Sequence, residues 1–126
     1  MKEPFWIGPW RIDPVKSLLE RDGHRFRVEP KAMRVLVYLA ERPGEDVPRD
    51  EILRAVWDGS PVQAEVLTNA IWELRKAFGD DAREPDFIQT VSRKGYRLVA
   101  PVNWTEQRPG ALSRVSTWLR ERLHRA

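Results

Sequence analysis

The sequence predicts a single mixed α+β domain with a short C-terminal appendage. Three observations predict it: β-favouring runs lie near both ends of the first hundred residues, segments of helical periodicity lie between them, and turn signals separate the two kinds. A chain of 126 residues with 41% hydrophobic content can bury the core of one domain of roughly 100 residues, but hardly of two. We expect the domain to span residues 1–102, followed by a linker and a basic amphipathic helix over 103–126.

Four β-favouring runs occupy the first thirty residues, at positions 5–7, 10–12, 17–21 and 24–28. Gly8-Pro9 separates the first two runs, and Asp22-Gly23 is a strong hairpin signal between the last two. We therefore predict a four-stranded antiparallel sheet at the N-terminus.

Two helices are predicted next. Pro30 suits a first helical position and begins a helix that runs to Arg42 and stops before Pro43-Gly44. A second helix follows Pro48 and spans residues 49–57. Only a few residues then separate it from the next helix, so a helix, a short turn and a helix are expected.

The longest helix is predicted over residues 61–78. Ser60 is expected as its N-cap, Pro61 in its first turn and Gln63 as the partner in a capping box. Gly79 suits the left-handed turn that ends a helix. These signals predict a helix of about five turns.

The two faces of this helix differ in character. At 100° per residue, one line is apolar and is expected to be buried: Leu67, Ile71, Leu74 and Phe78. The opposite side carries Glu65, Thr68, Asn69, Trp72 and Lys76, with Glu73 to one side and Arg75 at the boundary. A tryptophan is unusual on a solvated face, and packing on a neighbouring loop would explain it equally well.

A second hairpin is predicted near the end of the domain. Residues 87–91 and 96–100 alternate in polarity around the basic tip Ser92-Arg93-Lys94-Gly95. The acidic segment before it, residues 80–86, lacks the spacing of a calcium loop and is expected to be a solvated loop.

Charge and composition exclude several classes of function. The net charge is +3, and residues 80–126 carry nine basic and six acidic side chains, which favours a polyanionic partner over ordinary solubility alone. The chain has no cysteine, two separated histidines and no glycine-rich phosphate loop, so we expect no enzyme activity, no cofactor and no metal site. Without a signal peptide or a long apolar run, a cytoplasmic chain is expected.

Three runs together resemble a known family: PKAMRVLVYLAERPGEDVPRDEILRAVW, EVLTNAIWELRKAFGDD and FIQTVSRKGYRLVAPV. They are similar to the output domain of OmpR/PhoB-type transcriptional regulators, and most similar to the CadC-like and ToxR-like membrane activators, in which no receiver domain precedes it. The N-terminal run FWIGPWRIDP fits the same family, so the resemblance covers residues 5–102. It implies a winged helix-turn-helix fold.

The resemblance implies a sequence-specific regulator that binds double-stranded DNA, with helix 61–78 in the major groove and the wing at 92–95 on the adjacent minor groove or backbone. Asn69 is expected opposite an adenine edge, Thr68 and Trp72 near thymine methyl groups, and Glu73 near a cytosine amine or in a charge pair. Residues expected near phosphate or on the wing are Trp57, Glu65, Arg75, Lys76, Ser92, Arg93, Lys94, Tyr96 and Arg97. Trp57 and Tyr96 suit the core equally well.

This chain departs from the family pattern at several positions, so the base preference of other members cannot be transferred to it. Many members carry arginines in the middle of the helix, where this chain has Trp72 and Glu73, and Ser92 stands where others have arginine or proline. With few phosphate contacts, binding as a dimer or in tandem on repeated half-sites is expected. The resemblance also implies RNA polymerase as a partner. The main alternative is a winged helix that binds protein or RNA, with Trp72 as its anchor.

The tail carries apolar residues at helical spacing: Leu112, Val115, Trp118, Leu119 and Leu123. The resemblance to membrane activators favours a juxtamembrane segment, with a membrane tether past Ala126, or else a dimerisation helix. A helix docked on the domain and a solvated amphipathic helix are the other two interpretations.

Overall fold

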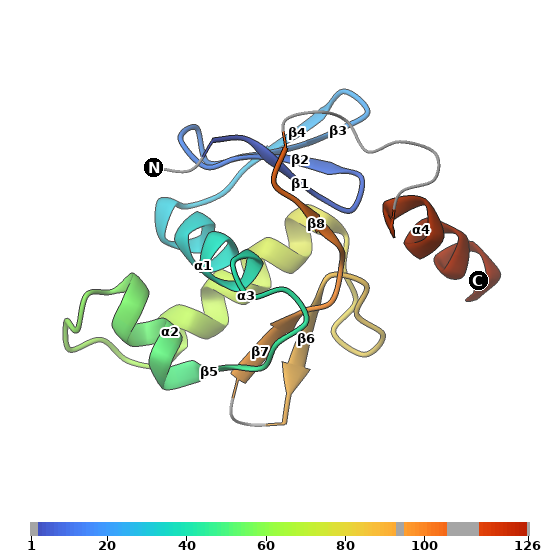
Figure 1. Cartoon of the computed structure of the whole chain (residues 1–126). Coiled ribbons are helices and arrows are strands. Elements are labelled where there is room, and N and C mark those ends of the chain that lie inside the picture. Colours follow the sequence, from blue (N-terminus) through green and yellow to red (C-terminus); the bar gives the residue numbers. More distant parts are fainter. Residues whose placement is uncertain (1–2, 93–94, 106–113, 126) are drawn as a thin grey trace.

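The computed structural model describes residues 3–92, 95–105 and 114–125. Helices α1 (Pro30–Ala40) and α3 (Glu65–Phe78) lie between two sheets: a five-stranded sheet built mainly from the N-terminal residues, and a three-stranded sheet that carries the wing (Figure 1). The predicted strands and helices appear in the predicted order, together with two short strands that were not predicted, and the mixed α+β winged-helix architecture is confirmed.

The N-terminal sheet contains the four predicted strands β1 (Phe5–Ile7), β2 (Trp10–Asp13), β3 (Leu18–Arg21) and β4 (His24–Arg27). A fifth strand, β8 (Val102–Asn103), returns from the far end of the domain and pairs antiparallel with β1, giving the order β4-β3-β2-β1-β8. The expectation of a four-stranded sheet with a linker from residue 103 was therefore wrong at this edge. Two residues carry too little periodicity to predict a strand, and only the pairing with β1 makes one.

Three helices form the middle layer: α1 (Pro30–Ala40), α2 (Arg49–Val56) and α3 (Glu65–Phe78). Proline stands at the start of α1 as predicted, and α1 ends two residues earlier than expected. Helix α3 ends as predicted, because Gly79 adopts a left-handed φ of 71° and the next N–H, that of Asp80, donates to Arg75 O at 2.8 Å.

The predicted start of α3 was wrong by four residues. Ser60 does not cap the helix, because its N–H donates to Trp57 O at 2.9 Å and so completes the turn that ends α2. Asp58 and Gly59 both have positive φ, which redirects the chain into a loop over residues 60–63. Ala64 stands at the N-cap instead. Helix α3 therefore has 14 residues and about four turns.

The second sheet has the order β5-β7-β6, with β5 (Val47–Pro48), β6 (Ile88–Val91) and β7 (Gly95–Leu98). The hairpin β6–β7 was predicted, but β5 was not, because a two-residue strand ending in proline has no local signal. Gly95 makes this pairing possible: a Cβ there would lie 2.1 Å from Val47 O. Arg93 and Lys94, at the predicted tip, lie outside the described residues.

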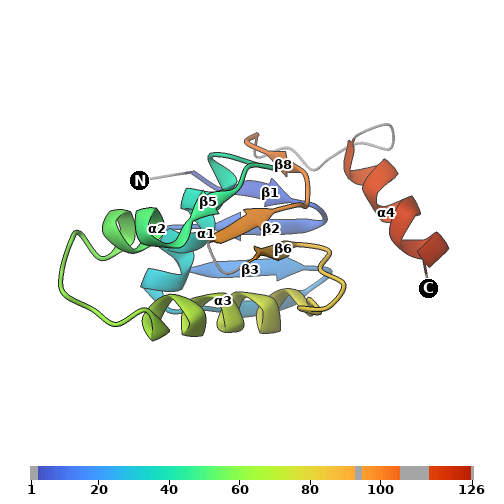
Figure 2. The same cartoon turned by 90° about the horizontal axis from the view of Figure 1, so that it is seen from below.

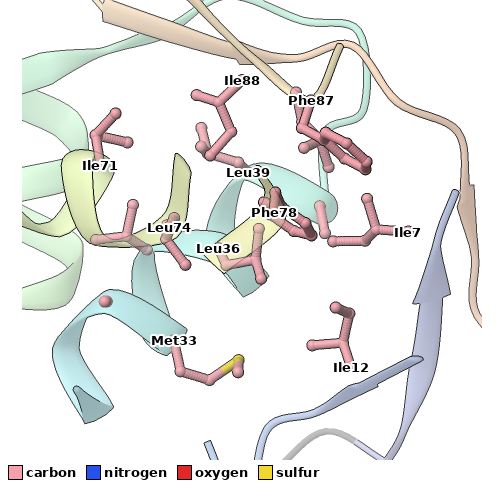
Figure 3. Close-up of a cluster of buried hydrophobic side chains, with 14 of the residues drawn as sticks. Ile7, Ile12, Met33, Leu36, Leu39, Ile71, Leu74, Phe78, Phe87 and Ile88 are labelled. Carbon is pink, nitrogen blue, oxygen red and sulfur yellow. The ribbon is translucent and has the colours of Figure 1, made fainter. Parts of the chain in front are cut away.

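The core fills the space between the two sheets around α1 and α3. Figure 3 shows Ile7 and Ile12 from the N-terminal sheet approaching Leu36 and Leu39 of α1, with Leu74 and Phe78 of α3 alongside. The buried face of α3 is the one predicted from its periodicity, and its Leu67, Ile71 and Leu74 are at most 1% exposed. Burial of this face fixes which side of α3 is turned outward.

Helix α4 (Arg114–Arg125) is docked on the domain, at the edge away from α2 (Figure 1). Val115 and Trp118 are buried, and the Trp118 ring packs edge-on against Phe87 with centroids 5.1 Å apart. Arg122 Nε lies 3.1 Å from Asp86 Oδ1. The structure thus supports an interpretation that the sequence favoured less. Among the described residues, no helix combines the length and apolarity needed to cross a bilayer.

Candidate nucleic-acid interface

The outer face of α3 is open along its length. Figure 2 shows α3 at one edge of the molecule, with the sheets and the other helices on its opposite side. Glu65, Thr68, Asn69, Trp72 and Lys76 are all exposed, as the helical periodicity predicted. Their exposure makes them available to a ligand, and their part in DNA binding stays a prediction.

Trp72 is the most prominent side chain on this face. It is 63% exposed, so the alternative of packing beneath a loop does not describe its placement. Lys76 Nζ lies over the indole, 5.0 Å from the ring centroid, a cation–π geometry that places an aromatic surface and a positive charge side by side.

Two surface grooves flank this Trp72–Lys76 pair. The first lies between α3 and the segment from β4 to α1, and its lining includes Phe26, Val28 and Asn69. The second lies between α3 and the turn after it, and its lining includes Thr68, Asp80 and Tyr96. Trp72 and Lys76 line both grooves and form the ridge between them.

Glu73 was expected to face a base or to pair with a charge, and the structure gives its carboxylate a partner within the protein. Glu73 Oε2 accepts a hydrogen bond from the backbone N–H of Glu29 at 2.7 Å. Glu29 immediately precedes α1, so the carboxylate lies at the positive end of that helix. The hydrogen bond ties α3 to the start of α1.

Arg75 was expected at a phosphate, but its guanidinium holds the wing. Its Nη2 donates to Ile88 O and to Thr90 Oγ1, both at 2.9 Å. The same side chain therefore joins α3 to strand β6. Lys76 is on the exposed side, and its contact with phosphate stays a prediction.

The wing residues divide into a buried and an exposed set. Tyr96 is 6% exposed, so its ring belongs to the core, although it also lines the second groove. Arg97 Nε donates to Asp46 Oδ1 at 2.6 Å and its Nη1 to Gln89 at 3.3 Å. Ser92 is exposed with a φ of 55°. The predicted contacts of Arg93 and Lys94 lie outside the described residues.

Trp57 lies at the end of α2, where its backbone N–H donates to Leu53 O at 3.0 Å. Its half-buried ring packs against the core. This placement agrees with the core interpretation that the sequence left open, and a phosphate contact by its indole stays untested.

Asp80 is a structural residue that sequence analysis missed. Its carboxylate accepts backbone N–H groups of Asp86 at 2.7 Å and of Ile88 at 2.9 Å, and it also bonds that of Phe87. The 80–86 segment is thus organised around a half-buried side chain and is not simply a solvated loop. Burial raises the pKa of the Asp80 carboxyl, although the backbone donors act in the opposite direction.

Within the described part of the chain, no cluster of metal-ligating side chains is present.

Comparison with a family model gives a match over residues 23–98, to the family described as "Transcriptional regulatory protein, C terminal". The transcriptional activator CadC of Escherichia coli is 37% identical over 105 residues, which are 82% of this chain and 20% of that protein. The cholera toxin transcriptional activator of Vibrio cholerae is 34% identical over 76% of this chain and 34% of its own length. The chain thus spans a fifth to a third of these two relatives.

Solved structures show the same architecture. The DNA-binding domain of E. coli CadC superposes with a TM-score of 0.73 at 36% identity, over 83% of this chain and all of that one. The Klebsiella pneumoniae RstA DNA-binding domain, in complex with the RstA box, superposes with a TM-score of 0.64 at 30% identity. That match covers 77% of this chain and 97% of the RstA domain.

Proposed function

Because the chain belongs to the family of C-terminal domains of transcriptional regulatory proteins, we propose that it binds specific sequences of double-stranded DNA through α3 and thereby regulates transcription. The observation that supports this most directly is the open polar face of α3, on which Trp72 is 63% exposed. A helix about 10–12 Å wide fits the major groove, which is about 12 Å wide.

Base recognition is assigned to the exposed side chains of α3. Asn69 can form two hydrogen bonds to an adenine: its side-chain NH2 donates to N7, and its Oδ1 accepts from the N6 amino group. Thr68, one residue earlier on the same face, offers a hydroxyl and a methyl group. Lys76, about two turns further along, contacts phosphate. Glu65 is exposed in the first turn, but a carboxylate repels phosphate, so we assign it no phosphate contact.

The wing supplies the second contact in this proposal. Ser92 is exposed beside the tip, and the predicted cations Arg93 and Lys94 follow it. We assign this tip to the neighbouring minor groove or the backbone. Arg97 would have to exchange Asp46 for a phosphate before it could take part, so we rank it below the tip residues.

The resemblance to membrane activators also suggests partners that this geometry does not carry. We propose RNA polymerase as a partner of the regulator, and we propose that this domain binds repeated half-sites in tandem or as a dimer. We also propose a cytoplasmic location for this domain, and a membrane tether if the native chain continues past Ala126. These proposals concern the whole regulator and do not rest on the exposed face of α3.

The decisive experiment is selection of bound duplexes from a random pool, followed by affinity measurements on the best site. Asn69→Ala should relax the preference at one adenine and leave the other positions unchanged. Thr117→Ala, at an exposed position on α4, is the matched control and should leave the profile as it was. If no duplex is enriched and the chain captures RNA or a protein partner through Trp72, the alternative module replaces this proposal.

A further inference from the structure

Trp72 is the feature of the interface that general DNA affinity does not require. Electrostatic attraction to phosphate needs cations, and hydrogen bonding to base edges needs polar groups, whereas an indole supplies one N–H donor and a large apolar surface. At 63% exposure, this ring leaves most of its surface in water in the free protein. Such a surface indicates an apolar group on the ligand.

The position of the ring is defined by its neighbours on α3. Lys76 Nζ lies over the indole, 5.0 Å from its centroid, so the ammonium group covers part of one face of the ring. The grooves on either side leave the pair standing as a ridge, so the ring reaches a duplex before the lining of either groove does. The ring is thus presented outward, with one of its faces occupied by the Lys76 ammonium.

In the major groove, the chemical group that matches this surface is the thymine methyl. Cytosine, guanine and adenine present donors and acceptors there, whereas thymine adds the C5-methyl group. We propose that the Trp72–Lys76 pair selects thymine at one position of the bound site, with the indole against the methyl group. This inference rests on the proposed DNA binding by α3 and assigns the base class that this part of α3 prefers.

The test uses duplexes in which single thymines of the selected site are replaced by deoxyuridine, because this change removes only the methyl group. At one position the substitution should weaken binding by about fourfold. This is the change in affinity expected when the burial of one apolar carbon in the complex is lost. At the other thymines the affinity should be nearly unchanged. Equal affinity for thymine and uracil at every position would overturn the inference.

Two variants assign the effect to its residue. Trp72→Ala should bind thymine and uracil duplexes equally at the sensitive position, and its unchanged thermal unfolding would show that the exposed ring is not needed for folding. Thr68→Ser, which removes the other methyl-bearing candidate on this face, should keep the fourfold difference. If Trp72→Ala keeps the difference and Thr68→Ser loses it, thymine is recognised by Thr68 and the inference is wrong.

The failure of this inference differs from failure of the proposed function. Absence of any enriched duplex would remove the proposed function and this inference together. A selected duplex that binds tightly, but without sensitivity to uracil, would retain DNA binding by α3 and remove only the role of Trp72.

Discussion

At the scale of single residues, Glu73 shows how a side chain on the helix that we propose to bind DNA can serve the fold. Its carboxylate accepts the Glu29 N–H at 2.7 Å beside the start of α1. Glu73→Ala should lower the free energy of unfolding by about 1–2 kcal/mol, because a hydrogen bond to a charged acceptor is lost. The measurement is urea denaturation, with Glu84→Ala at an exposed loop position as the control.

The same variant separates a positioning role from base recognition. If Glu73 only positions α3, Glu73→Ala should weaken binding to all sequences by a similar factor and keep the order of preferred bases. A relaxed preference confined to one G·C position would show instead that the carboxylate contacts a cytosine amine.

Asp80 is the residue with a defined pH dependence. Burial raises the pKa of its carboxyl above the ordinary value of 3.8, so the folded state holds this proton more tightly than the unfolded state. Its contribution to the free energy of unfolding is therefore fully present below pH 3.8 and declines as the pH rises through the folded pKa. Carboxyl carbon NMR should show a titration midpoint above 3.8, and a midpoint at or below it would contradict this account.

Asp80→Asn tests the structural role of the same carboxylate. An amide nitrogen cannot accept the backbone N–H groups that the second oxygen now binds, so the free energy of unfolding should fall by roughly 1–3 kcal/mol. Thermal or urea denaturation measures it. Asp81→Asn, at the exposed neighbouring position, is the control and should change stability far less.

The sequence predicted which side chains of α3 are exposed, but not which protein groups bind the side chains of Glu73 and Arg97. Helical periodicity placed Thr68, Asn69 and Trp72 on the exposed face, because exposure follows from the buried face opposite. Periodicity carries no information on the partner of Glu73, which lies 44 residues away, or of Arg97, which lies 51 residues away. Arg97 was therefore expected near DNA, and for Glu73 the sequence left a base contact and a charge pair both open.

At the scale of elements, Arg75 links α3 to the wing. Its guanidinium donates to Ile88 O and Thr90 Oγ1 on β6. Arg75→Met should weaken binding to all duplexes by misplacing the wing, while the slope of log affinity against log salt stays the same. If Arg75 contacts a phosphate, the slope should become shallower by about 1. Lys76→Met is the matched control. Because Lys76 is expected to contact a phosphate, this variant should make the slope of log affinity against log salt shallower by about 1.

Helix α4 belongs to the same connected set of elements. The Trp118 ring packs on Phe87, Phe87 stacks on Phe78 with centroids 4.4 Å apart, and Phe78 ends α3. Trp118→Ala should lower the free energy of unfolding by about 3 kcal/mol, because it removes a large buried ring. Thr117→Ala, next to it on the exposed side, is the control in urea denaturation. Equal stability of the two variants would mean that α4 is not docked in solution.

Local signals predicted most elements and failed where tertiary pairing decides. Pro30 and Gly79 each mark a helix end, and both marks were correct because a rigid ring and a left-handed turn act locally. Ser60 looked like an N-cap, but the positive φ at Asp58 and Gly59 committed its N–H to the end of α2. Strands β5 and β8 exist only through pairing with β7 and β1, and so left no local pattern.

At the scale of the whole molecule, the net charge of +3 is small, and several arginines are already paired within the protein. Arg97 is paired with Asp46, and Arg122 with Asp86. Lys76 on the exposed face of α3 and the basic stretch predicted at the wing are the cations that we assign to phosphate. This distribution favours contact at two places on a duplex and a modest number of phosphates.

Salt dependence measures that number directly. With about four to six phosphates neutralised, log affinity should fall with log salt at a slope near −4 to −5, so that raising salt from about 50 to 200 mM weakens binding roughly a hundredfold to a thousandfold. Such a single domain would bind weakly at the higher salt, which makes cooperative binding on repeated half-sites the expected mode. Gel-shift titrations on one and two half-sites measure both quantities. A slope shallower than about −1 would show that the exposed face of α3 does not lie against a duplex.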